Sequence, residues 1–93
     1  MKETPLWQII NDATDTADLV SGPCRLGKLI VYTVGTSGDI KIYDDQSSGT
    51  DNLLYHWVTA DGKAVIDFGG IRLTEGIKVV VTNDPVAVVT YDS

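Results

Sequence analysis

The chain has 93 residues, of which 43 % are hydrophobic and 22 % are charged, and this composition is typical of a single globular domain. Its net charge of −6 disfavours binding to nucleic acids and to anionic lipid, both of which attract clustered Lys and Arg. No apolar run approaches the roughly 18 residues of a membrane span, and the first residues lack the apolar region of a signal peptide. We therefore expect a protein made in a cytoplasm, with no nucleic acid and no membrane as its partner.

The first 18 residues differ in pattern from the rest of the chain. Residues 6–10 (LWQII) are mostly apolar, whereas residues 11–18 (NDATDTAD) are polar and acidic. Asp, Asn and Thr compete with helical hydrogen bonding, so this segment does not read as a helix. We interpret residues 1–18 as an N-terminal arm or an edge strand, and residues 19–93 as a β-sandwich domain.

Turn signals rich in Gly, Pro, Asn, Asp and Ser recur along the chain at the close, even spacing of an all-β sandwich or barrel. The runs between them are rich in β-branched and aromatic residues, which fit a pleated sheet. We predict an all-β, single-domain antiparallel β-sandwich, jelly-roll-like, of about eight strands. The expected strands lie near residues 6–10, 17–20, 25–34, 39–43, 53–59, 64–68, 77–82 and 86–91.

Alternation assigns faces to several of these strands, because successive side chains of a strand point to opposite sides. In 77–82, Ile77, Val79 and Val81 are expected to point inward and Lys78 outward. In 64–68, Asp67 opposes the apolar positions, and the two glycines that follow are expected to end the strand.

Two strands, 26–34 and 86–89, are apolar on both faces. Such strands sit centrally in a sheet or lie against another chain. This surplus of apolar surface is a first indication of assembly.

Five apolar residues are candidates for binding a partner. Trp7 in an N-terminal arm suits an anchor into a neighbouring subunit, because Trp is enriched at interface hot spots. Alternatively, Trp7 covers the core of its own chain. The candidate partner-binding residues are Leu6, Trp7, Ile9, Tyr55 and Trp57.

The acidic loop at 44–52 raises the possibility of a calcium site. Asp44 and Gly49 match positions one and six of an EF-hand loop, but position twelve is Tyr55, where the motif needs a bidentate Glu. A solvated hairpin loop explains the same residues. His56 is the one histidine and Cys24 the one cysteine, too few for a zinc site within the chain. We predict no catalytic, cofactor or metal site, and we do not expect an enzyme.

One further pattern concerns the whole chain from residue 20 onward. It combines Gly22-Pro23, the IKIYD strand at 40–44, the DFGGI turn at 67–71 and a final VVTY strand at 88–91. This plan resembles small virion proteins of tailed bacteriophages, such as capsid decoration and head-fibre-like proteins.

The resemblance implies a non-enzymatic structural protein of the virion, made in the cytoplasm of a bacterial host. Its partner would be the major capsid protein or another virion protein, which it would decorate or stabilise. It would also form a homo-oligomer, with a trimer favoured because closed symmetric interfaces bury apolar strands. An alternative is a host-surface or glycan-binding module of a phage fibre.

Overall fold

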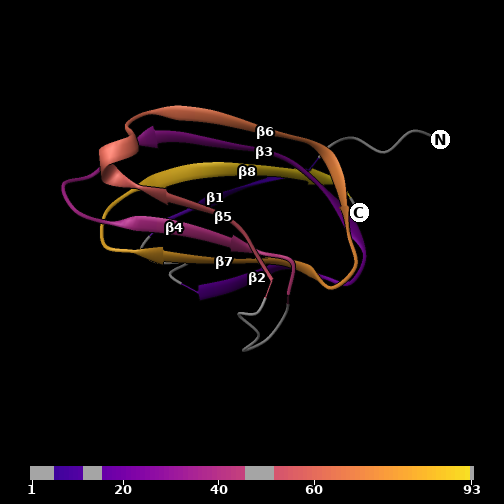
Figure 1. The fold of residues 1–93 in the computed structure, drawn as a ribbon. Coiled ribbons are helices and arrows are strands. Elements are labelled where there is room, and N and C mark those ends of the chain that lie inside the picture. Colours follow the sequence, from indigo (N-terminus) through magenta and orange to yellow (C-terminus); the bar gives the residue numbers. More distant parts are fainter. Residues whose placement is uncertain (1–5, 12–15, 46–51, 93) are drawn as a thin grey trace.

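The computed structural model describes residues 6–11, 16–45 and 52–92, which form eight strands in two antiparallel four-stranded sheets (Figure 1). The first sheet has the order β1-β8-β3-β6, and the second has the order β2-β7-β4-β5. The first consists of β1 (Leu6–Ile10), β8 (Val86–Asp92), β3 (Cys24–Thr33) and β6 (Ala64–Leu73). The second consists of β2 (Thr16–Ser21), β7 (Gly76–Thr82), β4 (Asp39–Tyr43) and β5 (Leu53–Val58).

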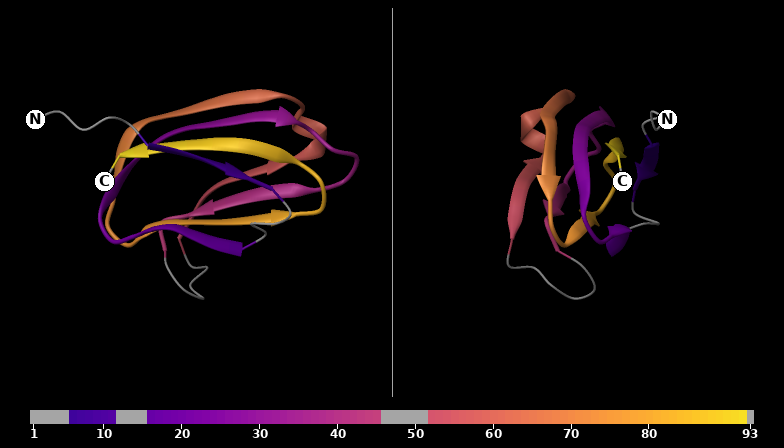
Figure 2. Two further views of the ribbon diagram at one scale, coloured as in Figure 1. Left: turned by 180° about the vertical axis from the view of Figure 1, so that it is seen from behind. Right: turned by 90° about the vertical axis from the view of Figure 1, so that its right-hand side faces the viewer.

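The strands pair in a nested order. β1 pairs with β8, β2 with β7, β3 with β6 and β4 with β5, always antiparallel. The chain is therefore one long hairpin folded over, and successive pairs of strands alternate between the two sheets (Figure 2). The prediction of an all-β antiparallel sandwich of about eight strands is confirmed. The finer expectation of a jelly-roll-like topology stays a prediction.

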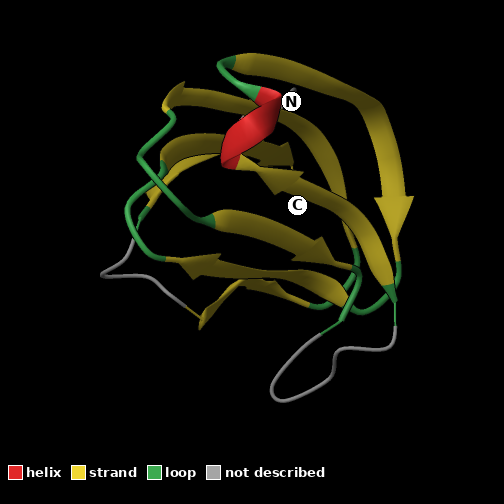
Figure 3. Cartoon of the chain, turned by 60° about the vertical axis from the view of Figure 1, so that its left-hand side comes forward, coloured by secondary structure: helices red, strands yellow, loops and turns green. Residues whose placement is uncertain are grey.

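The one helical element among the described residues is η2 (Thr59–Asp61), a single 3-10 turn between β5 and β6 (Figure 3). No helix in the described part of the chain is long and apolar enough to cross a membrane. β2 runs across residues 18 and 19, where the sequence suggested a boundary between an arm and the sandwich.

The core lies between the two sheets and takes alternate side chains from both. Ile77, Val79 and Val81 of β7 are at most 2 % exposed, as their alternation predicted. The prediction that Lys78 points into solvent is wrong, because this side chain is also only 2 % exposed. β7 is an inner strand, and the Lys78 ammonium lies 5.8 Å from the ring centre of Tyr43 on β4. A neighbouring aromatic ring can therefore shelter the stem and attract the charge.

β6 continues past Gly69 and Gly70, so the prediction that these glycines end the strand is wrong. Asp67 pairs with Lys28 of β3 and Ile71 pairs with Leu26, which leaves three residues of β6 opposite Gly27 alone. Gly69 and Gly70 have φ values of 68° and 72°, which side chains rarely adopt. The glycines thus form a bulge that lets the ladder resume and run on to Leu73.

Candidate interaction surface

The outer face of the first sheet carries an uninterrupted row of apolar side chains. Ile9 of β1 pairs with Val88 of β8, Val88 pairs with Ile30 of β3, and Ile30 pairs with Val65 of β6. Their chain neighbours Leu29, Val31, Ala87 and Val89 are buried in the core, so this set points outward. We call Ile9, Val88, Ile30 and Val65 the apolar row.

The apolar row is accessible to a partner. Val65 is 65 % exposed and Ile9 is 43 % exposed, whereas Val88 and Ile30 between them are half-buried. Tyr32, the next outward residue on β3, is exposed as well. β3 and β8 are the two inner strands of this sheet, so their predicted central position accounts for one apolar face. Their second apolar face remains on the surface.

A hollow lies beside the apolar row, where the bulge of β6 meets β3 and β8. The Asp67 carboxylate accepts a hydrogen bond from Gly69 N at 2.8 Å, and Arg25 donates to Gly70 O at 3.3 Å. The hollow has a volume of about 230 Å³. Its lining includes Arg25, Gly27, Lys28, Asp67, Gly70, Thr90 and Asp92.

Three of the predicted partner-binding residues belong to β1, the edge strand of this sheet. Trp7 is 64 % exposed, and it pairs with Thr90, which lines the hollow. Ile9 is part of the apolar row. Leu6 is also exposed, but it pairs with Tyr91, which packs against the core, so it points to the other side of the sheet. The structure therefore brings Trp7 and Ile9 together on the outer face, beside β8 and in line with Ile30 of β3. It also adds Val65 of β6, which no sequence pattern had singled out.

The other two predicted residues point inward. Trp57 is fully buried in the core, and its indole Nε1 donates a hydrogen bond to Gly62 O at 2.9 Å. The prediction that Trp57 binds a partner is wrong for this reason. Tyr55 is half-buried, and its ring meets Phe68 edge-on with the ring centres 5.9 Å apart. Alternation placed Tyr55 and Trp57 on one face, and that face turned out to be the core side.

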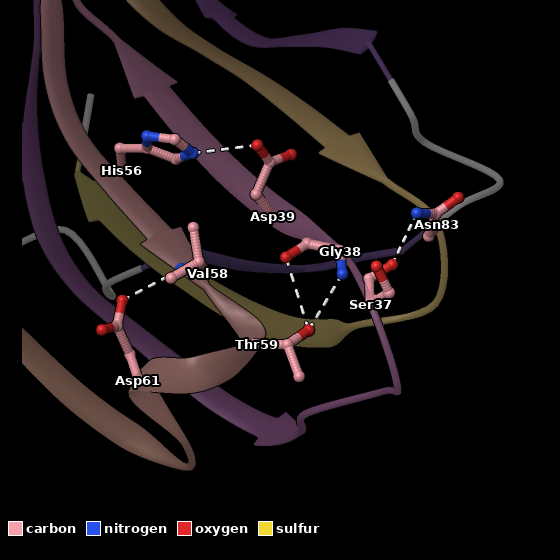
Figure 4. A network of polar contacts seen from close by, with 8 residues as sticks. All are labelled: Ser37, Gly38, Asp39, His56, Val58, Thr59, Asp61 and Asn83. Atoms are coloured by element: carbon pink, nitrogen blue, oxygen red, sulfur yellow. Dashed lines mark hydrogen bonds and ion pairs between the residues drawn. The ribbon is translucent and has the colours of Figure 1, made fainter.

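The outer face of the second sheet is more polar. His56 Nε2 lies 2.9 Å from the Asp39 carboxylate across β4 and β5 (Figure 4). Lys41 is the residue paired with His56. Burial alone would raise the pKa of Asp39, but hydrogen bonding with His56 and Thr82 and the nearby positive charges outweigh it and lower the pKa. The two outer faces of the sandwich thus differ in character, one crossed by the apolar row and the other carrying the His56–Asp39 contact and Lys41.

One end of the sandwich is tied together by polar contacts next to this pair. The Thr59 hydroxyl accepts from Gly38 N at 2.9 Å (Figure 4), and it donates to Val34 O at 3.1 Å. Asn83 donates to Ser37 O in the same region. The Thr59 hydroxyl is therefore engaged by backbone groups, and these contacts hold loops rather than assemble a nucleophile beside His56.

The Asp44 carboxylate is engaged by backbone groups as well. It accepts hydrogen bonds from Thr74 N and Glu75 N, in the turn between β6 and β7, and from Gly76 N at the start of β7, at 2.9 to 3.3 Å. Among the described residues, no group of three or more His, Cys, Asp or Glu is placed to hold a metal ion. Gly49, at position six of the proposed calcium loop, falls in 46–51, outside the described residues.

Cys24, the single cysteine, is buried in the core. Burial, and secondarily the charge of Asp44, raises the pKa of its thiol. A raised pKa keeps the thiol protonated, which suits a small core residue and not a nucleophile.

Comparison of the chain with known protein families, with curated proteins and with solved structures finds no match in any of the three. The outer face of the first sheet is consequently the candidate site on physical grounds alone.

Proposed function

We propose that this chain is a non-enzymatic structural protein of a bacteriophage virion, which binds the capsid shell or a neighbouring phage protein and decorates or stabilises the particle. The observation that carries the proposal is the apolar row across the outer face of one sheet. Burial of apolar surface stabilises a contact by about 25 cal/mol per Å², before the costs of association are subtracted.

The contacts of the polar residues also support a binding role over a catalytic one. The Asp44 carboxylate and the Thr59 hydroxyl are hydrogen-bonded to backbone groups, and the Cys24 thiol is buried with a raised pKa. His56 faces a carboxylate, and the Thr59 hydroxyl in the same network is bonded to backbone groups. Catalysis by acyl transfer needs a nucleophile, a base and an orienting group in contact.

The virion assignment itself rests on the resemblance of the strands around Ile40–Asp44 and Asp67–Ile71 to small phage structural proteins. The wrapping order of the strands is compatible with it, since jelly-roll sandwiches serve in viral capsids. The same architecture also serves in lectins, and a fold alone does not assign a function.

The alternative function is a glycan-binding module of a phage fibre. One observation favours it: Trp7, 64 % exposed, stands beside a hollow with charged side chains. A flat aromatic ring beside hydrogen-bonding groups suits a sugar, because a ring buries an apolar face while polar groups bind hydroxyls. Host cell-wall polysaccharide that changes the emission of Trp7 would favour this alternative, and an unchanged spectrum would count against it.

The main proposal is tested on purified particles of the phage whose genome encodes this sequence. Quantitative mass spectrometry is expected to find the chain in a fixed ratio to the major shell protein. Particles prepared without the gene are then titrated with the purified chain, and binding is expected to saturate. A chain that is absent from particles and fails to bind them would overturn the proposal.

A matched pair of variants tests whether binding to particles depends on the apolar row. Val65→Asp places a charge in the row, and Leu53→Asp places the same charge on an exposed Leu of β5, the edge strand of the other sheet. Because burying an unpaired carboxylate is costly, Val65→Asp should weaken binding to particles at least about tenfold. Leu53→Asp should bind as the wild type does.

A further inference from the structure

The order of side chains in the apolar row makes the outer face of the first sheet complementary to itself. From edge to edge the row reads Ile9, Val88, Ile30, Val65, with aliphatic side chains at all four positions. A twofold axis that runs along the strands, between β8 and β3, reverses the order of the strands in a facing copy. Ile9 then meets the second copy's Val65, and Val88 meets the second copy's Ile30.

The same axis places Trp7 opposite the hollow. Along the neighbouring row, Trp7 pairs with Thr90 on β8, and Lys28 of β3 pairs with Asp67 of β6. Because the strand order is reversed in the facing copy, Trp7 of one copy lies over Asp67 of β6 in the other copy. The most exposed aromatic side chain is thus matched with a recess of about 230 Å³ flanked by Lys28 and Asp67. A cation at the rim of such a recess attracts an indole ring.

Charge favours contact between copies at this face in particular. The chain as a whole has a net charge of −6, which disfavours contact between copies at most of its surface. Among the described residues, the outer face of the first sheet carries Arg25, Lys28 and Arg72 together with Asp67 and Asp92, which is three positive charges and two negative ones. This face is therefore free of the acidic excess of the chain.

The area of the face is of the size that a specific contact requires. Four strands spaced about 4.8 Å apart, with about seven residues each at about 3.3 Å, present a face of about 19 by 23 Å. Two such faces would together bury about 900 Å² if they were flat, and protruding side chains add to this area. The sum is close to the roughly 1,000 Å² of a specific interface.

We propose that the outer face of the β1-β8-β3-β6 sheet binds a second copy of this chain around a twofold axis parallel to the strands, with Ile9 against the second copy's Val65 and Trp7 over its Asp67–Gly70 hollow. This names the partner of the surface on which the proposed function rests. It replaces the threefold arrangement suggested by the virion resemblance, because a sheet face that meets its own copy forms a twofold contact. The shell would then be met by the remaining surfaces of the dimer.

Light scattering and sedimentation of the purified chain over a range of concentrations give the first test. We expect a reversible dimer, whose dissociation constant rises at least about tenfold in Val65→Asp and stays unchanged in the matched Leu53→Asp variant. A wild-type chain that stays monomeric up to about 1 mM, or a trimer, would overturn the inference.

Cross-linking tests the axis. Ile9→Cys and Val65→Cys are made separately in a Cys24→Ala background, mixed to allow exchange, and treated with a bismaleimide that spans about 8 Å, since facing sheets lie about 10 Å apart. The mixture should form the 9-to-65 cross-link, and neither variant alone should form cross-linked dimers. Efficient cross-linking of Ile9→Cys to itself would place the axis across the strands and overturn the proposed geometry.

The two proposals fail in different ways. A chain that dimerises as described but is absent from particles leaves the self-contact standing and removes the virion function. A monomeric chain that binds particles, with binding lost in Val65→Asp, does the reverse.

Discussion

The carboxylate of Asp84 accepts hydrogen bonds from both the backbone N–H and the hydroxyl of Thr36, the latter at 2.9 Å. Asp84 lies in the turn between β7 and β8, and Thr36 lies in the loop between β3 and β4, so this pair joins the two sheets at one end. The space between them is tight, because a Cβ built on Gly35 would lie 2.3 Å from Asp84 Oδ1.

This pair predicts an acid sensitivity of the fold. The hydrogen bonds from Thr36 lower the pKa of Asp84 below its ordinary value of 3.8, and the pKa of Asp39 is also lowered. A carboxyl whose pKa is lower in the folded state adds stability above its ordinary pKa and loses it as the pH falls through the folded value. We expect the free energy of unfolding, measured with urea, to fall below about pH 4.

The variant Asp84→Asn should be less stable at neutral pH and should lose less stability on acidification than the wild type. Thr36→Val removes the hydroxyl but keeps the backbone N–H and the charge of Asp84, so it should reduce the acid response only in part. An acid response that is equally steep in Asp84→Asn would contradict the assignment to this residue.

The two tryptophans should report separate parts of the molecule. Trp57 is fully buried, whereas Trp7 is 64 % exposed. In a Trp57→Phe variant the remaining emission should be red-shifted and quenched by iodide when the chain is dilute, and in Trp7→Phe it should be blue-shifted and protected. If both single-Trp variants are quenched equally, one of the two environments is wrongly described.

Replacing Trp57 should also be costly. Trp57→Phe removes the hydrogen bond to Gly62 O and leaves a gap in the core, so the free energy of unfolding should fall by about 2–3 kcal/mol. Trp7→Phe should change it by about 0.5 kcal/mol or less, as surface substitutions do. Urea unfolding followed by circular dichroism measures both variants without relying on the indole signal.

Two glycines with positive φ predict opposite tolerance of a side chain. A Cβ on Gly76 would lie 2.2 Å from Val20 O in the neighbouring strand, whereas a Cβ on Gly62 would meet nothing within 4 Å. Gly76→Ala should therefore lower the free energy of unfolding by about 3 kcal/mol or more. Gly62→Ala should lower it by about 1–2 kcal/mol, the cost of the backbone conformation alone. Equal effects would indicate that β2 and β7 can move apart without penalty.

The hydrogen bonds of Asp44 predict a structural role that calcium does not replace. Asp44→Asn keeps one carbonyl acceptor but loses the charge that faces three N–H groups, so the free energy of unfolding should fall by about 1–3 kcal/mol. Thermal unfolding of the wild type should be unchanged by calcium. A rise in Tm with calcium that is lost in Asp44→Asn would instead support the EF-hand-like reading of the loop.

Most of the fold could be predicted from the sequence because its signals are local. Turn residues mark where strands stop, and the strand predicted at 39–43 matches β4. The bulge at Gly69 and Gly70 could not be predicted, since glycines in a strand pattern equally mark an end or a bulge. Whether a bulge forms depends on Gly27 of a partner strand that the sequence does not identify.

The candidate surface was predictable only in part, for a related reason. Alternation divides the side chains of any strand between two faces, including the strands that contain Ile9 and Trp57, but it does not say which face meets the other sheet. Exposure of Ile9 and burial of Trp57 follow from the pairings with Val88 and Ile40. The apolar row exists only because four distant strands are aligned in one register, so Val65 carried no signal of its own.

The nested pairing of the strands has a consequence for how the protein is made. β8 occupies an inner position between β1 and β3, although it is synthesised after the seven other strands. While a ribosome is still translating residues 86–92, β1 has no partner and one long side of β3 is uncovered. The first sheet therefore lacks one of its two inner strands until β8 has emerged from the ribosome. We expect these contacts between distant parts of the chain to limit the folding rate. Until that moment the nascent chain exposes open strand edges, the surfaces on which chaperones and other copies of the chain compete.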